Sequence, residues 1–188
     1  MGILVQTTLY GIRDLNKIVA ENKLGRDAIA YGSQSNKFNN TPLTFCSYFC
    51  EGYNQIYGPK AEGVIFETEI KPVYVCPADS FNLLRGGNWL PEHEQFIFSS
   101  IEDMLKKYPT SNDFKKEFQE YFSNLKPEEV YPNLSKNYAG AKYRLDYCLY
   151  PDWNPGCNEI TFEKPLKIKN PKIFTSKNEL IFLLHNIS

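Results

Sequence analysis

Histidine and paired cysteines are scarce in this 188-residue sequence. Only His93 and His185 are present, and the five cysteines include no Cys-x-x-Cys pair. Cys46 and Cys50 could approach each other only on a helix. Structural zinc sites draw several ligands from Cys and His, so the sequence predicts no metal site. An odd cysteine count without such a framework is typical of reduced thiols, and we therefore expect a cytoplasmic protein.

Long apolar runs and a charge excess are also missing. No run is long enough to span a bilayer, and the first residues lack the basic stretch of a secretory signal. The formal net charge is -1, from 21 Lys and Arg against 22 Asp and Glu. The chain as a whole therefore has no electrostatic attraction to nucleic acid or anionic lipid, although a local patch could still bind nucleic acid. We expect no membrane association.

Aromatic residues, in contrast, are abundant. They make up 15% of the chain, with 13 Tyr and 13 Phe. Tyrosine is useful at ligand surfaces because it combines a rigid apolar face with a polar tip. The length is sufficient for one domain with a proper core and an insertion.

The order of predicted elements indicates an α+β fold. Strands are expected at residues 3–10, 42–49, 63–70 (extended by 73–76), 95–98, 143–150, 159–162, 167–174 and 179–184. Helices are expected at residues 14–24 with Asp14 as the cap, at 51–57 as one or two turns, at 101–108, and from 111 or 112 onward. Many strands with helices placed early and in the middle are typical of this class.

The last of these helices carries an aromatic stripe. Ser111 or Asn112 can cap it, and Ser99 or Ser100 can cap the helix before it. The stripe residues recur three or four positions apart on one face: Phe114, Phe118, Tyr121 and Phe122. Such a stripe is most often part of a core, and we interpret it as packing.

A turn-rich aromatic loop, residues 150–158, precedes Glu159. Its Pro, Asp, Asn and Gly residues favour chain reversal, and the Ile-Thr-Phe that follows Glu159 favours a strand. A carboxylate held at a strand start can stabilise a developing cation, and Tyr150 and Trp153 can cover a flat ligand. The alternative is an ordinary turn with an exposed glutamate, because the motif is short.

The order of parts resembles the ADP-ribosyltransferase superfamily, and most closely its toxins that modify nucleic acid. Leu9-Tyr10 followed by the helix at 14–24 is similar to the family's first strand and helix. The segment 44–57 resembles its strand that carries a serine or aromatic and runs into a helix. Residues 63–70 resemble the next strand, and residues 150–162 resemble the aromatic loop and the strand opened by the catalytic glutamate.

The resemblance implies one ADP-ribosyltransferase-like domain over residues 1–188, with a split β-sheet core and a helical insertion at 88–143. It implies a mono-ADP-ribosyltransferase of toxin or effector type that transfers ADP-ribose from NAD to a macromolecular acceptor, nucleic acid rather than protein, with an antitoxin as a further partner. One alternative is a catalytically inactive member that serves as a binding module. Another is an NAD glycohydrolase that uses water as the acceptor.

The resemblance also implies roles for individual residues. Glu159 would be catalytic, with Arg26 or Arg13 at the diphosphate or ribose, where a guanidinium suits phosphate. The implied cofactor-binding residues are Tyr10, Gly11, Ser47, Tyr48 and Tyr53. The loop that would meet the acceptor contributes Tyr150, Trp153 and Cys157. Ser47 could equally be a small buried strand residue, and Arg26 a charge at a helix end.

Two positions depart from the family pattern, and one other site competes with Glu159. Gly11 is at the position where the family usually has His or Arg, and Cys157 is where it often has Gln or Glu. Both departures support the catalytically inactive alternative. The departure at Cys157 also argues that the acceptor is not an arginine side chain. Glu92 and Glu94 also follow an aromatic and precede a predicted strand. Their spacing from residues 63–70 suits the family better, but helices follow them, so we favour Glu159.

The C-terminal part of the chain is rich in lysine. These lysines alternate with apolar residues, which places several on one side of the strands: Lys164, Lys167, Lys169, Lys172 and Lys177. Such a run is usually a solvated face. It could also guide a nucleic-acid acceptor through phosphate contacts.

Overall fold

A computed structural model describes residues 2–7, 12–24, 43–56, 62–78, 95–124, 149–163 and 165–186 of the chain. Within the first helix, the side chains of residues 12–14 are outside this description. Predictions that fall on residues 8–11, 25–42, 79–94 and 125–148 likewise lie outside the described residues.

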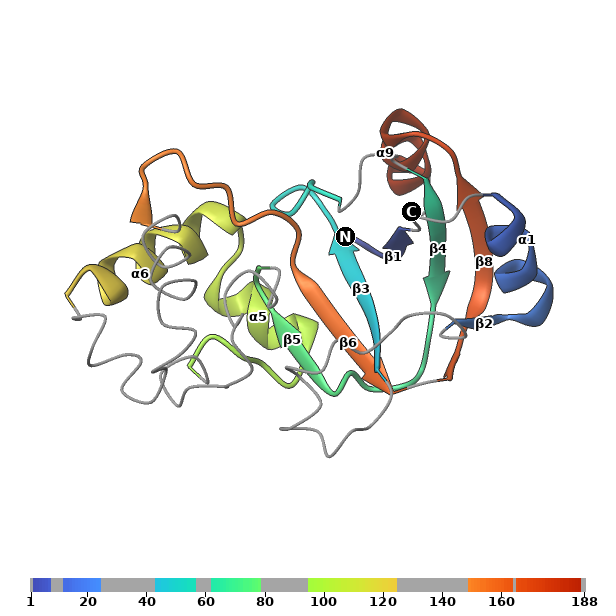
Figure 1. Ribbon diagram of the computed structural model, residues 1–188, viewed down its shortest axis with the longest axis horizontal. Helices are drawn as coiled ribbons and strands as arrows, with labels where there is room; N and C mark the ends of the chain where they lie inside the picture. Colours follow the sequence, from blue (N-terminus) through green and yellow to red (C-terminus); the bar gives the residue numbers. More distant parts are fainter. Residues whose placement is uncertain are drawn as a thin grey trace, which may run out of the picture.

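An antiparallel six-stranded sheet forms the centre of the described structure (Figure 1). Its strands run in the order β5-β6-β3-β1-β4-β8. They are β1 (Ile3–Thr7), β3 (Leu43–Phe49), β4 (Gly63–Glu67), β5 (Tyr74–Cys76), β6 (Glu159–Glu163) and β8 (Lys169–Phe174). A separate two-stranded sheet pairs β2 (Lys23–Leu24) with β7 (Leu166–Lys167). With the helices described below, this confirms the predicted α+β class.

Strand β3 changes partner along its length. Residues 43–46 pair with β6, whereas residues 47–49 pair with β1 on the other side. The two halves of the sheet are thus joined through β3, and the change of partner falls at Ser47 and Tyr48. These are two of the residues for which the sequence predicts a role in binding.

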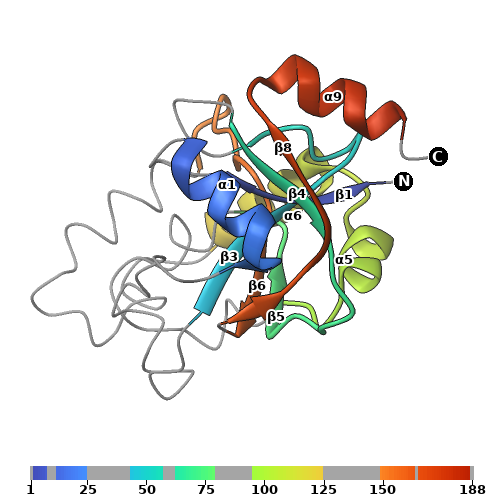
Figure 2. The same cartoon turned by 90° about the vertical axis from the view of Figure 1, so that its right-hand side faces the viewer.

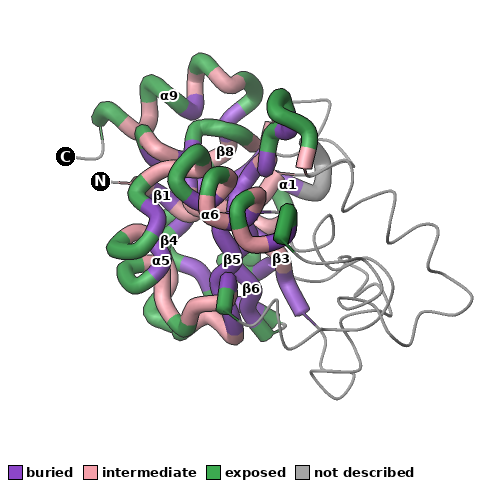
Figure 3. Tube along the Cα trace, turned by 90° about the vertical axis from the view of Figure 1, so that its left-hand side faces the viewer, coloured by how far each residue is buried: buried purple, intermediate pink, exposed green. Residues whose placement is uncertain are grey.

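Helices occupy both ends of the sheet. Helices α5 (Ile101–Lys107) and α6 (Ser111–Ser123) lie near β5, and α1 (Ile12–Glu21) packs against β8 (Figure 1). The last helix, α9 (Lys177–His185), also contacts β8 (Figure 2). The outer sides of these helices are exposed while β3, β5 and β6 are mostly buried (Figure 3).

The aromatic stripe of α6 is a core element, as predicted. Phe114, Phe118 and Phe122 are buried. They pack with Phe96 and Trp153 in a cluster of rings whose centroids lie 4.5–6.3 Å apart. Ring pairs at such separations stabilise each other beyond simple area burial. This aromatic cluster covers the β5 end of the sheet.

The helix caps follow the polar residues that precede each helix. Ser100 caps α5, as predicted, by accepting a hydrogen bond from the Asp103 N–H at 3.1 Å. The predicted cap of α6 is wrong by one or two residues, because Thr110 is the cap. Thr110 and Asp113 form a reciprocal capping box, which satisfies two backbone donors at once.

Four predicted elements in the first two thirds of the chain differ from the structure. Helix α1 begins at Ile12, so Asp14 is inside it and not its cap. Residues 51–56 form a turn and a Cys50–Tyr53 bridge instead of helical turns. Residues 73–76 do not extend β4, because β5 lies at the opposite edge of the sheet. The expected strand at 95–98 is a single bridge between Phe98 and Val75.

The predicted strand at residues 179–184 is also wrong, because this segment is part of α9. Ser176 caps the helix by accepting from the Glu179 N–H, and the Glu179 carboxylate accepts from the Thr175 N–H. A short apolar run such as Leu-Ile-Phe-Leu-Leu fits a strand or a helix equally well, and here the capping residues decide. At residues 149 and 150, the described end of the strand predicted over 143–150, there is no strand either.

Candidate functional site

Glu159 opens β6, as the sequence predicts. This strand lies between β3 and β5, so Glu159 is on an interior strand of the sheet and not on an edge strand. Glu159 pairs with Cys76 of β5. On the other side the β3–β6 register ends at the Cys46–Ile160 pair, which places Ser47 at the next position, opposite Glu159. The alternative of an exposed glutamate in an ordinary turn is wrong, since Glu159 is only 9% exposed.

Two hydroxyl groups contact the buried carboxylate. The Tyr74 hydroxyl donates a hydrogen bond to Glu159 Oε1. The Thr161 hydroxyl lies 3.4 Å from the same oxygen. Burying an ionised carboxylate is costly unless hydrogen bonds replace its water, and bonds to a charged acceptor are stronger than neutral ones. The carboxylate is therefore oriented by groups from two neighbouring strands.

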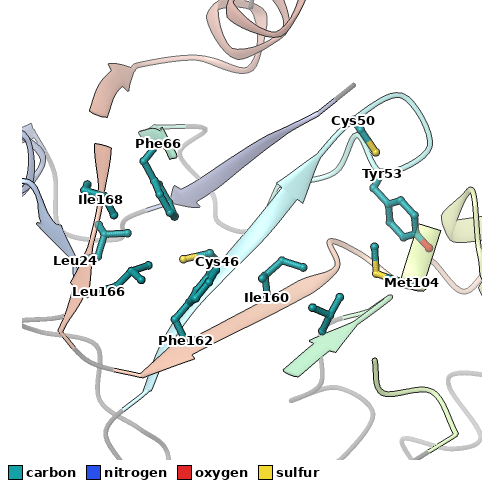
Figure 4. Close-up of a cluster of buried hydrophobic side chains, with 11 residues drawn as sticks. Leu24, Cys46, Cys50, Tyr53, Phe66, Met104, Ile160, Phe162, Leu166 and Ile168 are labelled. Atoms are coloured by element: carbon teal, nitrogen blue, oxygen red, sulfur yellow. The ribbon is translucent and has the colours of Figure 1, made fainter. Parts of the chain in front are cut away.

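Two buried thiols, Cys46 of β3 and Cys50 just after it, have a pKa above the ordinary value. Burial raises the pKa of the Cys46 thiol, and the negative charge of Glu159 raises it further. Cys46 points into the apolar cluster with Ile160 and Phe162, on the other face of the sheet (Figure 4). Burial likewise raises the pKa of Cys50. A thiol must ionise to act as a nucleophile or metal ligand, so neither cysteine is suited to those roles.

Asn158, the residue before Glu159, ties the loop to β3. Its Oδ1 accepts a hydrogen bond from the Tyr48 N–H at 2.7 Å, and its Nδ2 donates to the Tyr48 carbonyl at 2.9 Å. The side-chain amide thus makes the two backbone hydrogen bonds that a strand residue would make. It does so at the point where β3 stops pairing with β6 and begins to pair with β1. Sequence reasoning missed this contact, because an asparagine in a turn-rich loop is typical of the turn itself.

The predicted cofactor residues of β3 and the turn after it do not all lie on one face of the sheet. Side chains alternate between the two faces of a strand, so Ser47 shares the face of Glu159 while Tyr48 packs with the cluster around Cys46. Tyr53 belongs to that same cluster (Figure 4). Its hydroxyl donates a hydrogen bond to the Tyr108 carbonyl at 3.0 Å. Ser47 therefore lies on the face of the sheet that carries Glu159, whereas the rings of Tyr48 and Tyr53 belong to the cluster on the other face.

The aromatic loop before β6 is held against α6. Gln119 donates to the Tyr150 carbonyl at 2.8 Å, and Lys115 donates to the Pro151 carbonyl at 2.6 Å. Trp153 is 3% exposed and its ring packs 5.2 Å from that of Phe118. Trp153 is thus a core residue rather than a cover for a ligand. Tyr150, 59% exposed, is the aromatic of this loop that faces solvent.

Cys157 and Arg13 complete the predicted residues within the described chain. Cys157 is buried in the loop just before Asn158. Arg13 lies in the first turn of α1, and its side chain is outside the description. The other predicted site residues lie outside the described residues: Tyr10, Gly11, Arg26, Glu92 and Glu94. Their roles stay predictions.

The lysine-rich segment forms a surface that carries exposed lysines and one lysine in an ion pair. Exposed Lys23 and Lys167 stand directly opposite each other in the β2–β7 pair. Lys172 is also exposed, on β8. Lys169 is 2.6 Å from Glu69 in an ion pair, which leaves it less available to a phosphate. Lys164 lies outside the described residues.

No protein-family model matches this sequence, and no curated protein or solved structure matches the chain. Across the described ranges, no group of three or more His, Cys, Asp or Glu side chains is arranged to hold a metal ion. Among the described helices, none has both the length and the apolar character needed to cross a bilayer.

Proposed function

We propose that the protein is a mono-ADP-ribosyltransferase that uses NAD and modifies a macromolecular acceptor. The observation that carries the proposal is the position of Glu159. Its carboxylate is buried at the start of a strand that lies between two others, it accepts a hydrogen bond from Tyr74, and it is next to the point where β3 stops pairing with β6. A preorganised carboxylate in a dry site is the group that the chemistry of NAD cleavage requires.

The reaction breaks the bond between nicotinamide and the ribose of NAD. The bonding electron pair leaves with nicotinamide, and positive charge develops on the ribose ring. A carboxylate that accepts a hydrogen bond from a ribose hydroxyl stabilises this charge more in the transition state than in the ground state, which is the condition for catalysis. The acceptor then bonds to the ribose carbon and gives up a proton.

The sheet order supports the same proposal. The resemblance names three strands: the first one, the one that carries a serine or aromatic, and the one opened by the glutamate. In the structure β6 is next to β3, and β3 is next to β1. The division of β3 between two partners accords with a split sheet, and its changeover falls beside Glu159.

For the acceptor, we favour nucleic acid over protein. Lys23, Lys167 and Lys172 are exposed on adjoining elements and could contact phosphates. The formal charge of -1 means that such an attraction would have to be local. This face lies on β2, β7 and β8, so it would guide the acceptor rather than take part in the reaction.

One incubation tests the proposal. The protein is mixed with NAD labelled in its adenylate part, with DNA, RNA and a protein extract offered separately. Release of nicotinamide together with a labelled macromolecule is the expected result. Nicotinamide release without any labelled macromolecule would indicate a glycohydrolase instead. Absence of both products would contradict enzymatic activity and favour a binding module.

A further inference from the structure

Tyr74 is placed by the sheet to reach Glu159. It lies on β5 opposite Thr161 of β6. Glu159 is two residues before Thr161 and therefore shares its face of the strand. The side chain of Tyr74 therefore reaches diagonally from β5 to the position two residues before its direct partner, and its hydroxyl donates a hydrogen bond to Glu159 Oε1.

The ring of Tyr74 is held by the aromatic cluster under α6. Tyr74 is 2% exposed and belongs to the same buried cluster as Phe96, Phe114 and Phe118. Close-packed cores restrict side chains to few rotamers. The position of the hydroxyl is thus fixed by the helical region between β5 and β6, and not by Glu159 alone.

A hydroxyl that donates to a carboxylate favours its ionised form, whereas burial disfavours it. Among the described residues, the titratable groups shown next to Glu159 include the thiol of Cys76, its partner on β5, and that of Cys46 on β3, which interacts electrostatically with it. Burial raises the pKa of Cys46, so this thiol adds no charge near neutral pH. Among these groups, Tyr74 is the one that offers the carboxylate a strong donor.

We propose that Tyr74 is a positioning residue that keeps the Glu159 carboxylate ionised and aimed for the reaction. Its catalytic meaning rests on the proposed function, because the charge on Glu159 matters only if it stabilises a cation. The physical link between the two side chains can be tested without that assumption.

The test compares wild type, Tyr74→Phe and Tyr108→Phe. Tyr108 is the matched control, because it is equally buried in the same cluster and its hydroxyl faces Glu117 of α6. The titration of the Glu159 carboxyl is followed by carbon NMR, with the signal assigned from its loss in Glu159→Gln. The pH dependence of nicotinamide release is measured on the same three proteins.

We expect Tyr74→Phe to move the NMR midpoint of Glu159 upward by about one pH unit or more, since the ionised form loses a strong donor. The acid limb of the pH–rate profile should move in the same direction. Tyr108→Phe should leave both unchanged. An unmoved NMR midpoint in Tyr74→Phe would overturn the inference, whatever the activity. A shifted midpoint in a protein that does not cleave NAD would leave the link intact and refute the proposed function instead.

Discussion

Asn158 holds Tyr48 by both of its backbone polar groups, with hydrogen bonds of 2.7 and 2.9 Å to a residue 110 positions away in the chain. This side-chain amide lies where β3 stops pairing with β6 and begins to pair with β1. The next residue, Glu159, is the first residue of β6. The orientation of the carboxylate therefore depends on this contact as well as on Tyr74.

Replacement of Asn158 by alanine should destabilise the fold. Two partly buried backbone groups of Tyr48 would lose their partners, which costs roughly 1–3 kcal/mol in the free energy of unfolding. Urea unfolding measures this loss. Asn154→Ala is the control, because that exposed side chain only accepts from Gly156 N–H within its own turn. Equal effects of the two substitutions would contradict the role given to Asn158.

The aromatic cluster should be the most sensitive part of the core. Phe118→Ala removes a buried ring that packs against Phe114, Phe122 and Trp153. We expect a loss of about 3–5 kcal/mol, because the cavity cannot collapse fully. Tyr150→Ala, at an exposed ring of the adjoining loop, should change the melting temperature little. A tolerated Phe118→Ala would show that the cluster is not tightly packed.

Glu117 provides a pH test of the contact between α5 and α6. Burial alone would raise its pKa, but the hydrogen bond from Lys107 and the positive charge of that side chain outweigh it and lower the pKa from 4.5. The folded state then binds fewer protons than the unfolded state as the pH falls. The stabilisation is present above pH 4.5 and disappears at lower pH.

The substitution Glu117→Gln should accordingly lower stability modestly at neutral pH, since the pair is largely exposed and screened. The difference from wild type should vanish in acid. Thermal unfolding at several pH values measures both proteins. A difference that persists unchanged at low pH would show that the charge of Glu117 is not its cause.

Whether the exposed lysines of β2 and β7 bind a nucleic-acid acceptor can be tested by varying the salt concentration. If Lys23 and Lys167 contact phosphates of a nucleic-acid acceptor, Lys23→Gln with Lys167→Gln should weaken binding and reduce the salt slope by about two. Lys169→Gln should have a smaller effect, because Lys169 is already paired with Glu69. Filter binding of labelled DNA and RNA at several salt concentrations measures the slope. Acceptor binding that does not respond to salt would exclude this face as the guide.

The parts of the fold that were predictable from sequence are those set by local patterns. The stripe at Phe114, Phe118 and Phe122 has helical spacing, and Glu159 follows a turn and precedes β-branched and aromatic residues, so both were found. Helix α9 was missed because its apolar run has no clear period and because Ser176 and Glu179 were not interpreted as its capping residues. Local pattern favours an element but does not always distinguish a strand from a helix.

The parts that were not predictable depend on contacts between distant residues. Tyr74 and Glu159 are 85 positions apart, and nothing in the local sequence of β5 indicates that it lies beside β6 and not beside β4. Trp153 illustrates the converse, because an aromatic in a loop suggests a ligand surface until its packing partner on α6 is known. The position of Glu159 was therefore predictable, whereas the groups that orient it were not.

The most direct test of the account is the rate of nicotinamide release from NAD by Glu159→Gln. Glutamine keeps the size of the side chain and can still accept from Tyr74, so the melting temperature should stay close to that of wild type. Glu163→Gln, at the exposed end of the same strand, is the matched control and should keep its activity. We predict that Glu159→Gln loses at least about a hundredfold in rate because the developing cation loses its counter-charge. Release at the wild-type rate by a folded Glu159→Gln protein would contradict the central claim.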